Sequence, residues 1–132
     1  MGDLVIPHPS FKINKSTTAP QIMRKIERQM NAAINAKVNW KLDNTEVIYD
    51  EILQVSDVYL HNHLIATVSD TGIKLYDGGH QSNTTKSRLN AILSAHGLPG
   101  EGVFQKRYEW FIRLWNGTEH FVTEFRSGMR LA

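Results

Sequence analysis

A chain of 132 residues with 41% hydrophobic and 21% charged side chains is long enough for one hydrophobic core and too short for two, and its composition excludes a disordered or fibrous protein. The absence of cysteine excludes disulfides, cysteine nucleophiles and cysteine-ligated zinc, and it favours a reducing compartment. Residues 1–70 carry 7 basic and 8 acidic side chains (−1) and residues 71–132 carry 8 and 5 (+3), so the C-terminal half permits an anionic partner.

The N-terminal residues carry no recognisable membrane or targeting signal. No stretch approaches the ~18 apolar residues of a membrane span, and residues 1–7 lack the charged-then-apolar layout of a signal peptide. Two prolines and the lack of periodicity predict an extended arm over residues 1–15, followed by a single domain over residues 16–132. We expect a cytoplasmic protein without membrane contacts.

The first helix is predicted over residues 19–36. Apolar residues recur there at helical spacing, namely Ile22, Ile26, Met30 and Ile34. Thr18 and Gln21 have the spacing of a capping box, and Pro20 falls in the first turn, where its missing N–H removes no helical hydrogen bond. The remaining face is polar, which predicts a helix that covers one side of a sheet.

The middle of the chain shows the period-2 alternation of β-strands. Strands are predicted at about 38–42 and 45–50, and then as a meander at 58–60, 64–68 and 73–76. The acidic segment from Asp50 to Asp57 fits a short helix or a loop, and the pattern leaves both open.

A second helix is predicted in the third quarter of the chain. It runs from Lys86 to Ala95 with Asn83 or Thr84 as its N-cap. We expect the helix to end at Gly97 in a left-handed conformation, because Pro99 forbids its continuation.

The last third of the chain is predicted as strands at 103–107, 109–115 and 118–125. The Asn116-Gly117 pair is a strong signal for a two-residue hairpin loop. In that register the expected core residues are Trp110, Ile112, Leu114 and Phe121. The predicted fold class is therefore α+β: an antiparallel sheet of about six or seven strands, built from the meander and the C-terminal hairpin, covered on one face by two helices.

Two segments carry a resemblance to known proteins. Residues 83–90 read Asn-Thr-Thr-Lys-Ser-Arg-Leu-Asn, and residues 102–106 and 108–111 belong to an aromatic hairpin. In these segments the chain resembles small tailed-bacteriophage proteins without an assigned activity, over roughly residues 58–128. The resemblance carries over no site residue and no cofactor. It implies a phage origin and a location in the host cytoplasm.

The start of the second helix has the features of an anion site. Gly78-Gly79 precedes Thr84, Thr85 and Lys86, which would place hydroxyls and an amine at the positive end of a helix dipole. The spacing of a P-loop is absent. Two interpretations stay open: a loop that contacts phosphate, or hydroxyls that only cap the helix while Lys86 and Arg88 are solvated.

Basic and aromatic residues are interleaved in the C-terminal half. Cations for phosphates beside rings for bases are what a groove for single-stranded nucleic acid needs. The candidate nucleic-acid-binding residues are Thr84, Thr85, Lys86, Arg88, Lys106, Arg107, Phe111, Arg113 and Trp115. Phe111 and Trp115 are decisive, because a second layer over them would remove the platform on which bases stack.

Patterns for catalysis and metal binding are weak. His61 and His63 are placed on one side of a strand but lack a third ligand nearby in sequence. The acidic residues from Glu46 to Asp57 are expected to be solvated, and no nucleophile elbow or catalytic triad is visible. We expect no enzymatic activity, no cofactor and no metal.

Three hypotheses about function follow. The first is a non-catalytic phage accessory protein that binds nucleic acid through its basic C-terminal half. The alternative is a host-directed inhibitor that binds a host defence or transcription protein through the first helix or the open face of the sheet. A third is an enzyme that holds a phosphate-bearing substrate at residues 78–86. A continuous positive stripe favours the first, whereas an apolar patch around Phe111 and Trp115 with few cations favours the second.

Overall fold

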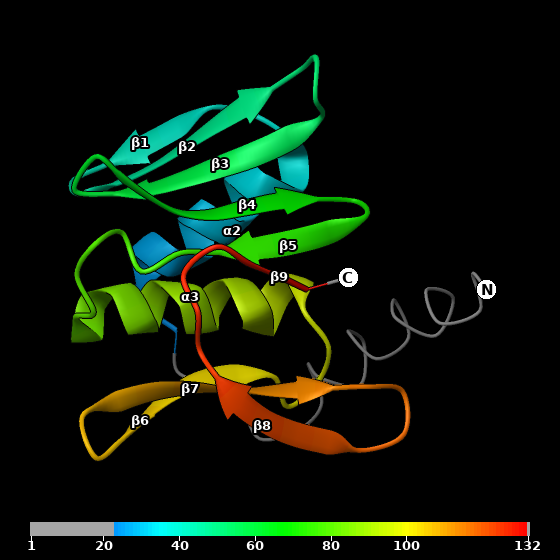
Figure 1. The fold of residues 1–132 in the computed structure, drawn as a ribbon. Helices are drawn as coiled ribbons and strands as arrows, with labels where there is room; N and C mark the ends of the chain where they lie inside the picture. The colour runs from blue at the N-terminus through cyan, green and yellow to red at the C-terminus, as the bar shows by residue number, and fades with distance from the viewer. Residues whose placement is uncertain (1–22, 132) are drawn as a thin grey trace.

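The computed structural model describes residues 23–131, which form two helices and nine strands (Figure 1). The helices are α2 (Lys25–Ala36) and α3 (Asn83–His96). The strands form a six-stranded sheet in the order β1-β2-β3-β4-β5-β9 and a three-stranded sheet in the order β6-β7-β8. The α+β class is confirmed, but the strands make two sheets instead of one. The predicted arm at 1–15 and the Thr18–Gln21 capping box lie outside the described residues.

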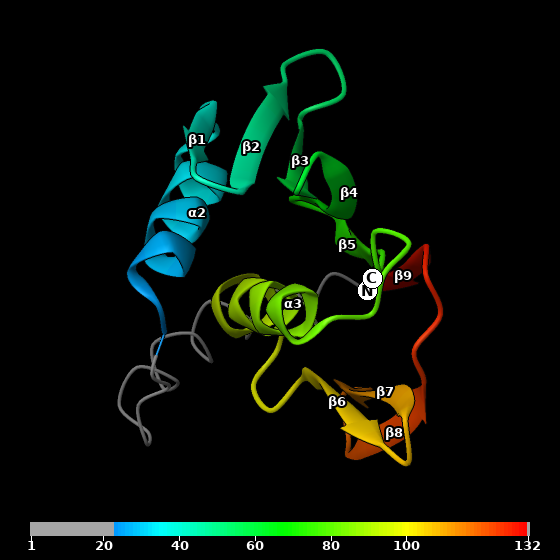
Figure 2. The ribbon, with the colours of Figure 1, turned by 90° about the vertical axis from the view of Figure 1, so that its left-hand side faces the viewer.

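Helix α3 lies between the two sheets (Figure 2). Helix α2 packs against α3 and against β1 (Trp40–Leu42) and β2 (Thr45–Asp50). Helix α3 contacts β4 in the larger sheet and β6 in the smaller one. Its side chains Leu89, Ile92 and Leu93 are 0% exposed, as expected for a helix that is covered on opposite sides. The second sheet therefore covers a side of α3 that the first leaves open.

The meander builds most of the larger sheet, as the alternation predicts. Consecutive antiparallel neighbours are β2, β3 (Val55–Leu60), β4 (His63–Ser69) and β5 (Gly72–Leu75). Of the acidic segment from Asp50 to Asp57, only residues 51–54 form a loop, and Asp57 lies in β3, which the pattern did not predict. In this loop Asp50 Oδ1 accepts hydrogen bonds from the N–H groups of Ile52 (2.9 Å) and Leu53 (3.0 Å). This cap satisfies the loop backbone but leaves both apolar side chains in solvent, with Ile52 93% and Leu53 70% exposed.

Helix α2 begins later than predicted, and helix α3 begins earlier. Helix α2 begins at Lys25 and not at residue 19, and the N–H of Arg24 donates to Glu27 Oε1 at 3.3 Å. The N-cap of α3 is Ser82, and neither Asn83 nor Thr84, because Ser82 Oγ accepts from the N–H of Thr85 at 3.1 Å. Helix α3 thus gains a first turn at residues 83–85 that the sequence pattern placed outside it.

The left-handed ending predicted for α3 is wrong, because Gly97 has φ −89° and ψ −165°. Its N–H still donates to the Leu93 carbonyl at 2.9 Å. The next N–H, of Leu98, donates to Glu101 Oε1 at 2.8 Å. A side chain from the following loop therefore accepts the bond that a left-handed turn would direct to the last helical carbonyls.

Gly97 is nevertheless required for close packing. A Cβ atom at this position would lie 2.8 Å from both Glu101 Oε1 and the Leu93 carbonyl oxygen. We expect Gly97→Ala to destabilise the fold by about 1–3 kcal/mol, the range for overpacking. Urea unfolding of both proteins measures this difference, and a loss under about 0.5 kcal/mol would mean that the loop can shift without cost.

The last third differs from its prediction in register and in connectivity. Strands β6 (Gly102–Lys106), β7 (Glu109–Trp115) and β8 (His120–Glu124) form the smaller sheet, and an additional strand β9 (Met129–Leu131) pairs with β5. Asn116 Oδ1 accepts hydrogen bonds from the N–H groups of Thr118 (2.8 Å) and Glu119 (2.9 Å). This Asx turn closes a four-residue loop in place of the predicted two-residue loop, so Leu114 pairs with Phe121 and not with Glu119.

The predicted core of the last hairpin is correct for β7 and wrong for β8. Trp110 is 4% and Ile112 0% exposed, and Leu114 is partly buried against them. Phe121 is 41% exposed, because β8 is the outer strand and α3 lies against β6 at the opposite edge. The aromatic ring that packs edge-to-face on Trp110 is Phe125, with 5.4 Å between centroids.

Candidate functional site

The predicted anion site at the start of α3 is occupied by the protein's own contacts. Thr85 is 3% exposed, and its Oγ1 lies 2.9 Å from Ser82 Oγ and donates to the His80 carbonyl at 3.3 Å. Gly79 lies in the preceding loop, where its N–H donates to Asp77 Oδ1 at 2.8 Å. The hydroxyl of Thr85 is therefore bonded within the protein, and the helix is capped by Ser82 and not by Asn83 or Thr84.

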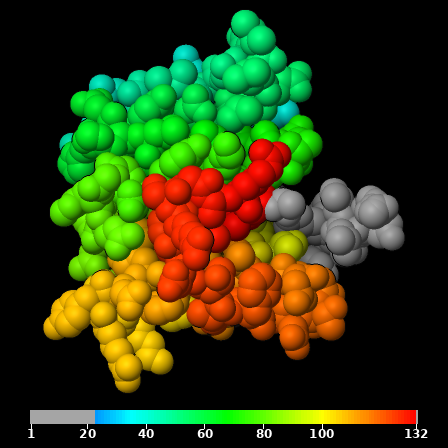
Figure 3. Space-filling model, viewed as in Figure 1, coloured from blue at the N-terminus to red at the C-terminus, as the bar shows by residue number. Residues whose placement is uncertain are grey.

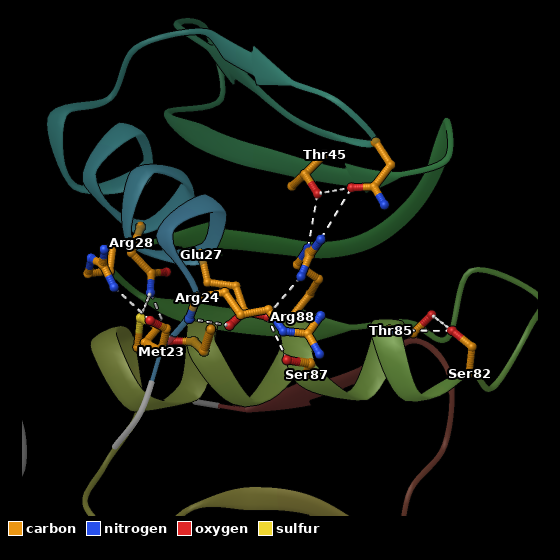
Figure 4. Close-up of polar contacts among 12 residues, drawn as sticks. Met23, Arg24, Glu27, Arg28, Thr45, Ser82, Thr85, Ser87 and Arg88 are labelled. Atoms are coloured by element: carbon orange, nitrogen blue, oxygen red, sulfur yellow. Dashed lines mark hydrogen bonds and ion pairs between the residues drawn. The ribbon is translucent and has the colours of Figure 1, made fainter. Parts of the chain in front are cut away.

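Arg88 is the centre of a buried polar cluster and is not solvated (Figure 4). Its Nη1 donates to Glu27 Oε2 at 2.9 Å, and both side chains are 4% exposed. Its Nε donates to Thr45 Oγ1 at 3.0 Å, and its Nη2 donates to Asn44 Oδ1 at 3.2 Å. Ser87 Oγ donates to the same Glu27 oxygen at 2.6 Å. Arg88 thus joins α3, α2 and the β1–β2 turn, and it is not available to a ligand.

Asn90 fixes the smaller sheet to the other side of α3. Its Nδ2 donates to the Val103 carbonyl at 2.9 Å, and its Oδ1 accepts from the Val103 N–H at 2.6 Å. Residues 87 to 90 therefore all have structural roles. Ser87 and Arg88 bind Glu27, Leu89 lies in the core, and Asn90 holds β6.

One face of the smaller sheet points away from α3, and we call it the outer face. By strand register it consists of Phe104, Lys106, Glu109, Phe111, Arg113, Trp115, His120, Val122 and Glu124. All of these side chains are partly or fully exposed. Phe104 and Phe111 stack with 5.8 Å between centroids, and Trp115 lies against His120 at 4.8 Å. No helix or strand of residues 23–131 covers this face (Figures 1 and 2).

The turn between β6 and β7 projects from the body of the protein, and we call Arg107 and Tyr108 the β6–β7 tip (Figure 3). Both residues are left-handed, with φ 52° and 68°, between the paired residues Lys106 and Glu109. Tyr108 is 92% exposed. The backbone thus makes a two-residue turn of the kind that normally contains Asn-Gly, but with two bulky side chains directed into solvent.

The structure brings together five of the nine candidate residues. These are Lys106, Arg107, Phe111, Arg113 and Trp115, on the outer face and the β6–β7 tip. Lys86 lies on α3, on the other side of the smaller sheet, with Nζ 3.5 Å from Oε1 of Gln105, which is paired with the inner-face residue Trp110. Thr84 is partly buried, and Thr85 and Arg88 are buried. From the sequence, Tyr108 was noted as one of the rings between basic residues but was not chosen as a site residue, and Phe104 was missed.

The charges on the outer face are balanced. Lys106 and Arg113 share it with Glu109 and Glu124, and Glu124 Oε1 lies 3.7 Å from the guanidinium of Arg126. The face therefore has an aromatic and apolar centre with few cations, and its charges do not form the continuous positive stripe that would favour nucleic acid.

Comparison of the sequence with known protein families gives a match. A family model described as Kyanoviridae Gp96 protein matches residues 23–132. The chain belongs to the Kyanoviridae Gp96 protein family. The expected origin in a tailed phage is thereby confirmed, since these are cyanophages. Comparisons with curated proteins and with solved structures gave no significant match.

Other parts of this Gp96-family chain are less suited to binding. His61 and Asn62 form the two-residue turn between β3 and β4, so His61 is not on a strand beside His63 as expected. Residues 23–131 contain no group of three or more His, Cys, Asp and Glu side chains that could hold a metal ion. A shallow cavity of about 290 Å³ lies between that turn and the β1–β2 turn, lined by polar residues of the two turns and by Lys41 and Glu46 of β1 and β2. None of the helices within residues 23–131 has the length and apolar character needed to cross a bilayer.

An acidic cluster lies on the outer side of the larger sheet. The pKa of Asp57 is raised, mainly because the side chain is partly buried and secondly because the carboxylate of Asp50 lies nearby. The pKa of Tyr59 is also raised, mainly by partial burial and then by the negative charges of Asp57 and Glu46. The carboxylates of Glu46, Asp50 and Asp57 that contribute to these shifts make that surface unfavourable for phosphate.

Proposed function

We propose that this Gp96-family protein is a non-catalytic binding protein that attaches to a protein of the infected host through the β6–β7 tip and the outer face. The observation that carries the proposal is the tip itself. Tyr108 is 92% exposed on a left-handed backbone, and Arg107 beside it is left-handed as well. Left-handed backbone costs about 1–2 kcal/mol for such a residue, and strain of this kind is concentrated at functional sites.

Other left-handed residues in this fold make the contrast clear. Lys37 ends α2 with a positive φ and Gln54 has one in the β2–β3 loop, so this conformation is not confined to the tip. Among the hairpin turns, Asp43, His61 and Asn62 also have positive φ, but Asp, Asn and His are the types that tolerate this conformation. Arg and Tyr are not. They are, with Trp, the residues that dominate the binding energy of protein interfaces. Two such residues side by side at an exposed turn support a binding role for the tip.

The chemistry of the surface defines the kind of partner. Tyr108 would insert into an apolar pocket, and Lys106 and Arg107 beside it would face an acidic rim. The neutral outer face, with Phe111 and Trp115 partly exposed, would continue the contact. A protein surface fits this combination better than nucleic acid, because a nucleic-acid groove requires excess positive charge along its length. Of the hypotheses drawn from sequence, the host-directed inhibitor is therefore favoured.

Replacing the tip by an ideal turn should stabilise the protein and abolish its binding. We expect the double substitution Arg107→Asn with Tyr108→Gly to increase the free energy of unfolding by about 1–2 kcal/mol, since Asn-Gly adopts this turn without strain. Urea unfolding measures the change. If the variant is less stable than the natural protein, then the tip residues contribute to folding and the argument from strain fails.

Capture from infected cells tests the partner directly. We expect the tagged protein to retain a host protein after nuclease treatment, and Tyr108→Ala to lose it by at least about tenfold in affinity once that partner is purified. Ile52→Ala is the matched control, because Ile52 is 93% exposed and its β2–β3 loop lies at the other end of the molecule from the β6–β7 turn (Figure 1). A partner that Tyr108→Ala retains, or that Ile52→Ala loses, contradicts the proposed site.

Single-stranded nucleic acid is the second candidate ligand. The Phe104–Phe111 stack beside Lys106 and Arg113 favours it, because these rings and cations could contact bases and phosphates. A labelled oligonucleotide titrated at low salt would then bind weakly, with a logarithmic salt slope of about 0.7 per phosphate neutralised. Lys106→Ala with Arg113→Ala would lower that slope. If saturable binding is absent up to about 100 μM protein, the nucleic-acid hypothesis is rejected.

A further inference from the structure

Strand β8 forms an edge of the smaller sheet that no other described strand covers. All five of its residues are exposed, including Phe121 at 41% and Val122 at 54%. Natural edge strands are usually protected by lysine, proline or a β-bulge. Strand β8 contains neither residue, and its pairing with β7 is continuous. Its free edge is therefore open to pairing with another strand.

The register with β7 determines which backbone groups point outward. The Phe125 N–H donates to the Trp110 carbonyl at 3.0 Å, and the Asn116 N–H donates to the Glu119 carbonyl at 3.2 Å. Hydrogen-bonded pairs alternate along an antiparallel ladder, so Phe121 and Thr123 also direct their backbone groups toward β7. The N–H and C=O groups of His120, Val122 and Glu124 consequently point away from the sheet.

We propose that a second copy of this chain pairs with β8, antiparallel and with two-fold symmetry about Val122. In this register His120 of each copy lies opposite Glu124 of the second copy, and Val122 lies opposite itself. On the side toward α3, Phe121 lies opposite Thr123 of the second copy. Neighbouring symmetric registers, centred on Phe121 or Thr123, place Val122 opposite His120 or Glu124 instead. The register about Val122 is therefore selected because it places an imidazole opposite a carboxylate and an apolar side chain opposite its equivalent. His120 Nε2 already lies 2.8 Å from the Pro99 carbonyl, which leaves Nδ1 as the ring nitrogen for the contact with Glu124.

The resulting dimer joins two three-stranded sheets into one of six strands. The two outer faces become continuous, with Val122 at their junction. An isologous contact of this kind closes on itself and does not propagate into fibres. Two five-residue strands bury less surface than a typical stable interface, so the dimer is weak, with a dissociation constant on the order of 10–100 μM. This association is independent of the partner proposed for the β6–β7 tip.

Sedimentation equilibrium from about 5 to 500 μM protein tests the proposal. We expect a monomer–dimer equilibrium in the natural chain and an increase of at least about tenfold in the dissociation constant for Val122→Pro. Proline is tolerated on an edge strand where the N–H faces solvent, so circular dichroism should show a folded variant. The control is Ile52→Lys, which removes from the β2–β3 loop an apolar side chain that is more exposed than Val122. A monomer at all concentrations, or an association that Ile52→Lys abolishes and Val122→Pro does not, overturns the proposal.

A disulfide tests the register independently of the proline variant. The chain has no cysteine, so Val122→Cys introduces a single thiol. Directly opposed residues of a hydrogen-bonded pair have Cα atoms about 5.5 Å apart, which is within the range of a disulfide. With an added oxidant, such as oxidised glutathione, two thiols of the Val122→Cys variant should form a covalent dimer. This dimer should form at least about tenfold faster than that of the Thr118→Cys variant, whose thiol lies in the exposed β7–β8 loop. Equal rates would reject the register.

Discussion

Arg88→Ala is expected to destabilise the protein by about 3–5 kcal/mol, the largest effect of any single polar substitution. The substitution leaves the Glu27 carboxylate buried without its cation, and breaking one partner of a buried ion pair costs about this much. It also removes the donors to Thr45 Oγ1 and Asn44 Oδ1, at 3.0 and 3.2 Å. Urea unfolding measures the loss, and Arg113→Ala is the matched control because Arg113 is exposed.

A double-mutant cycle separates the pair from its surroundings. Glu27→Ala alone should cost a similar amount, since it strands the Arg88 guanidinium. The double variant should cost less than the sum, by about 1–3 kcal/mol, because no charge is left unpaired. Losses that add without coupling would show that the 2.9 Å contact contributes nothing beyond the two separate side chains.

Trp110→Ala is expected to cost about 3–5 kcal/mol, the usual range for emptying a buried aromatic site. Trp110 is 4% exposed and its ring contacts Phe125 edge-to-face, so the substitution removes packing between β7 and the segment that leads to β9. Total stabilities are only about 5–15 kcal/mol, so this variant should be marginally folded. Trp115→Ala provides a comparison on the half-exposed outer face and should cost clearly less. A loss under about 1 kcal/mol for Trp110→Ala would contradict the assignment of the inner face.

The candidate site was predictable in part. The alternation of residue types in β7 predicts Phe111, Arg113 and Trp115 on one face, because successive side chains of a strand point to opposite faces of the sheet. Arg88 and Thr85 could not be assigned to the interior from sequence. A basic or hydroxyl residue at a helix start looks the same whether it faces solvent or a buried carboxylate. The nearest signal was Glu27, an acidic residue one position from Ile26 on the apolar side of α2.

The sequence by itself determined the features that depend on neighbours a few residues apart. The meander of β2 to β5, the end of α3 before Pro99 and the burial of Trp110 and Ile112 all follow from periodicity and local stereochemistry. Only the tertiary structure decided the features that depend on distant partners. These are the division into two sheets, the extended Gly97, the strand β9 and the buried Arg88. The physical reason is that each requires a group from elsewhere in the chain: Glu101 accepts the bond after Gly97, β5 pairs with β9, and Glu27 neutralises Arg88 across 61 residues of sequence.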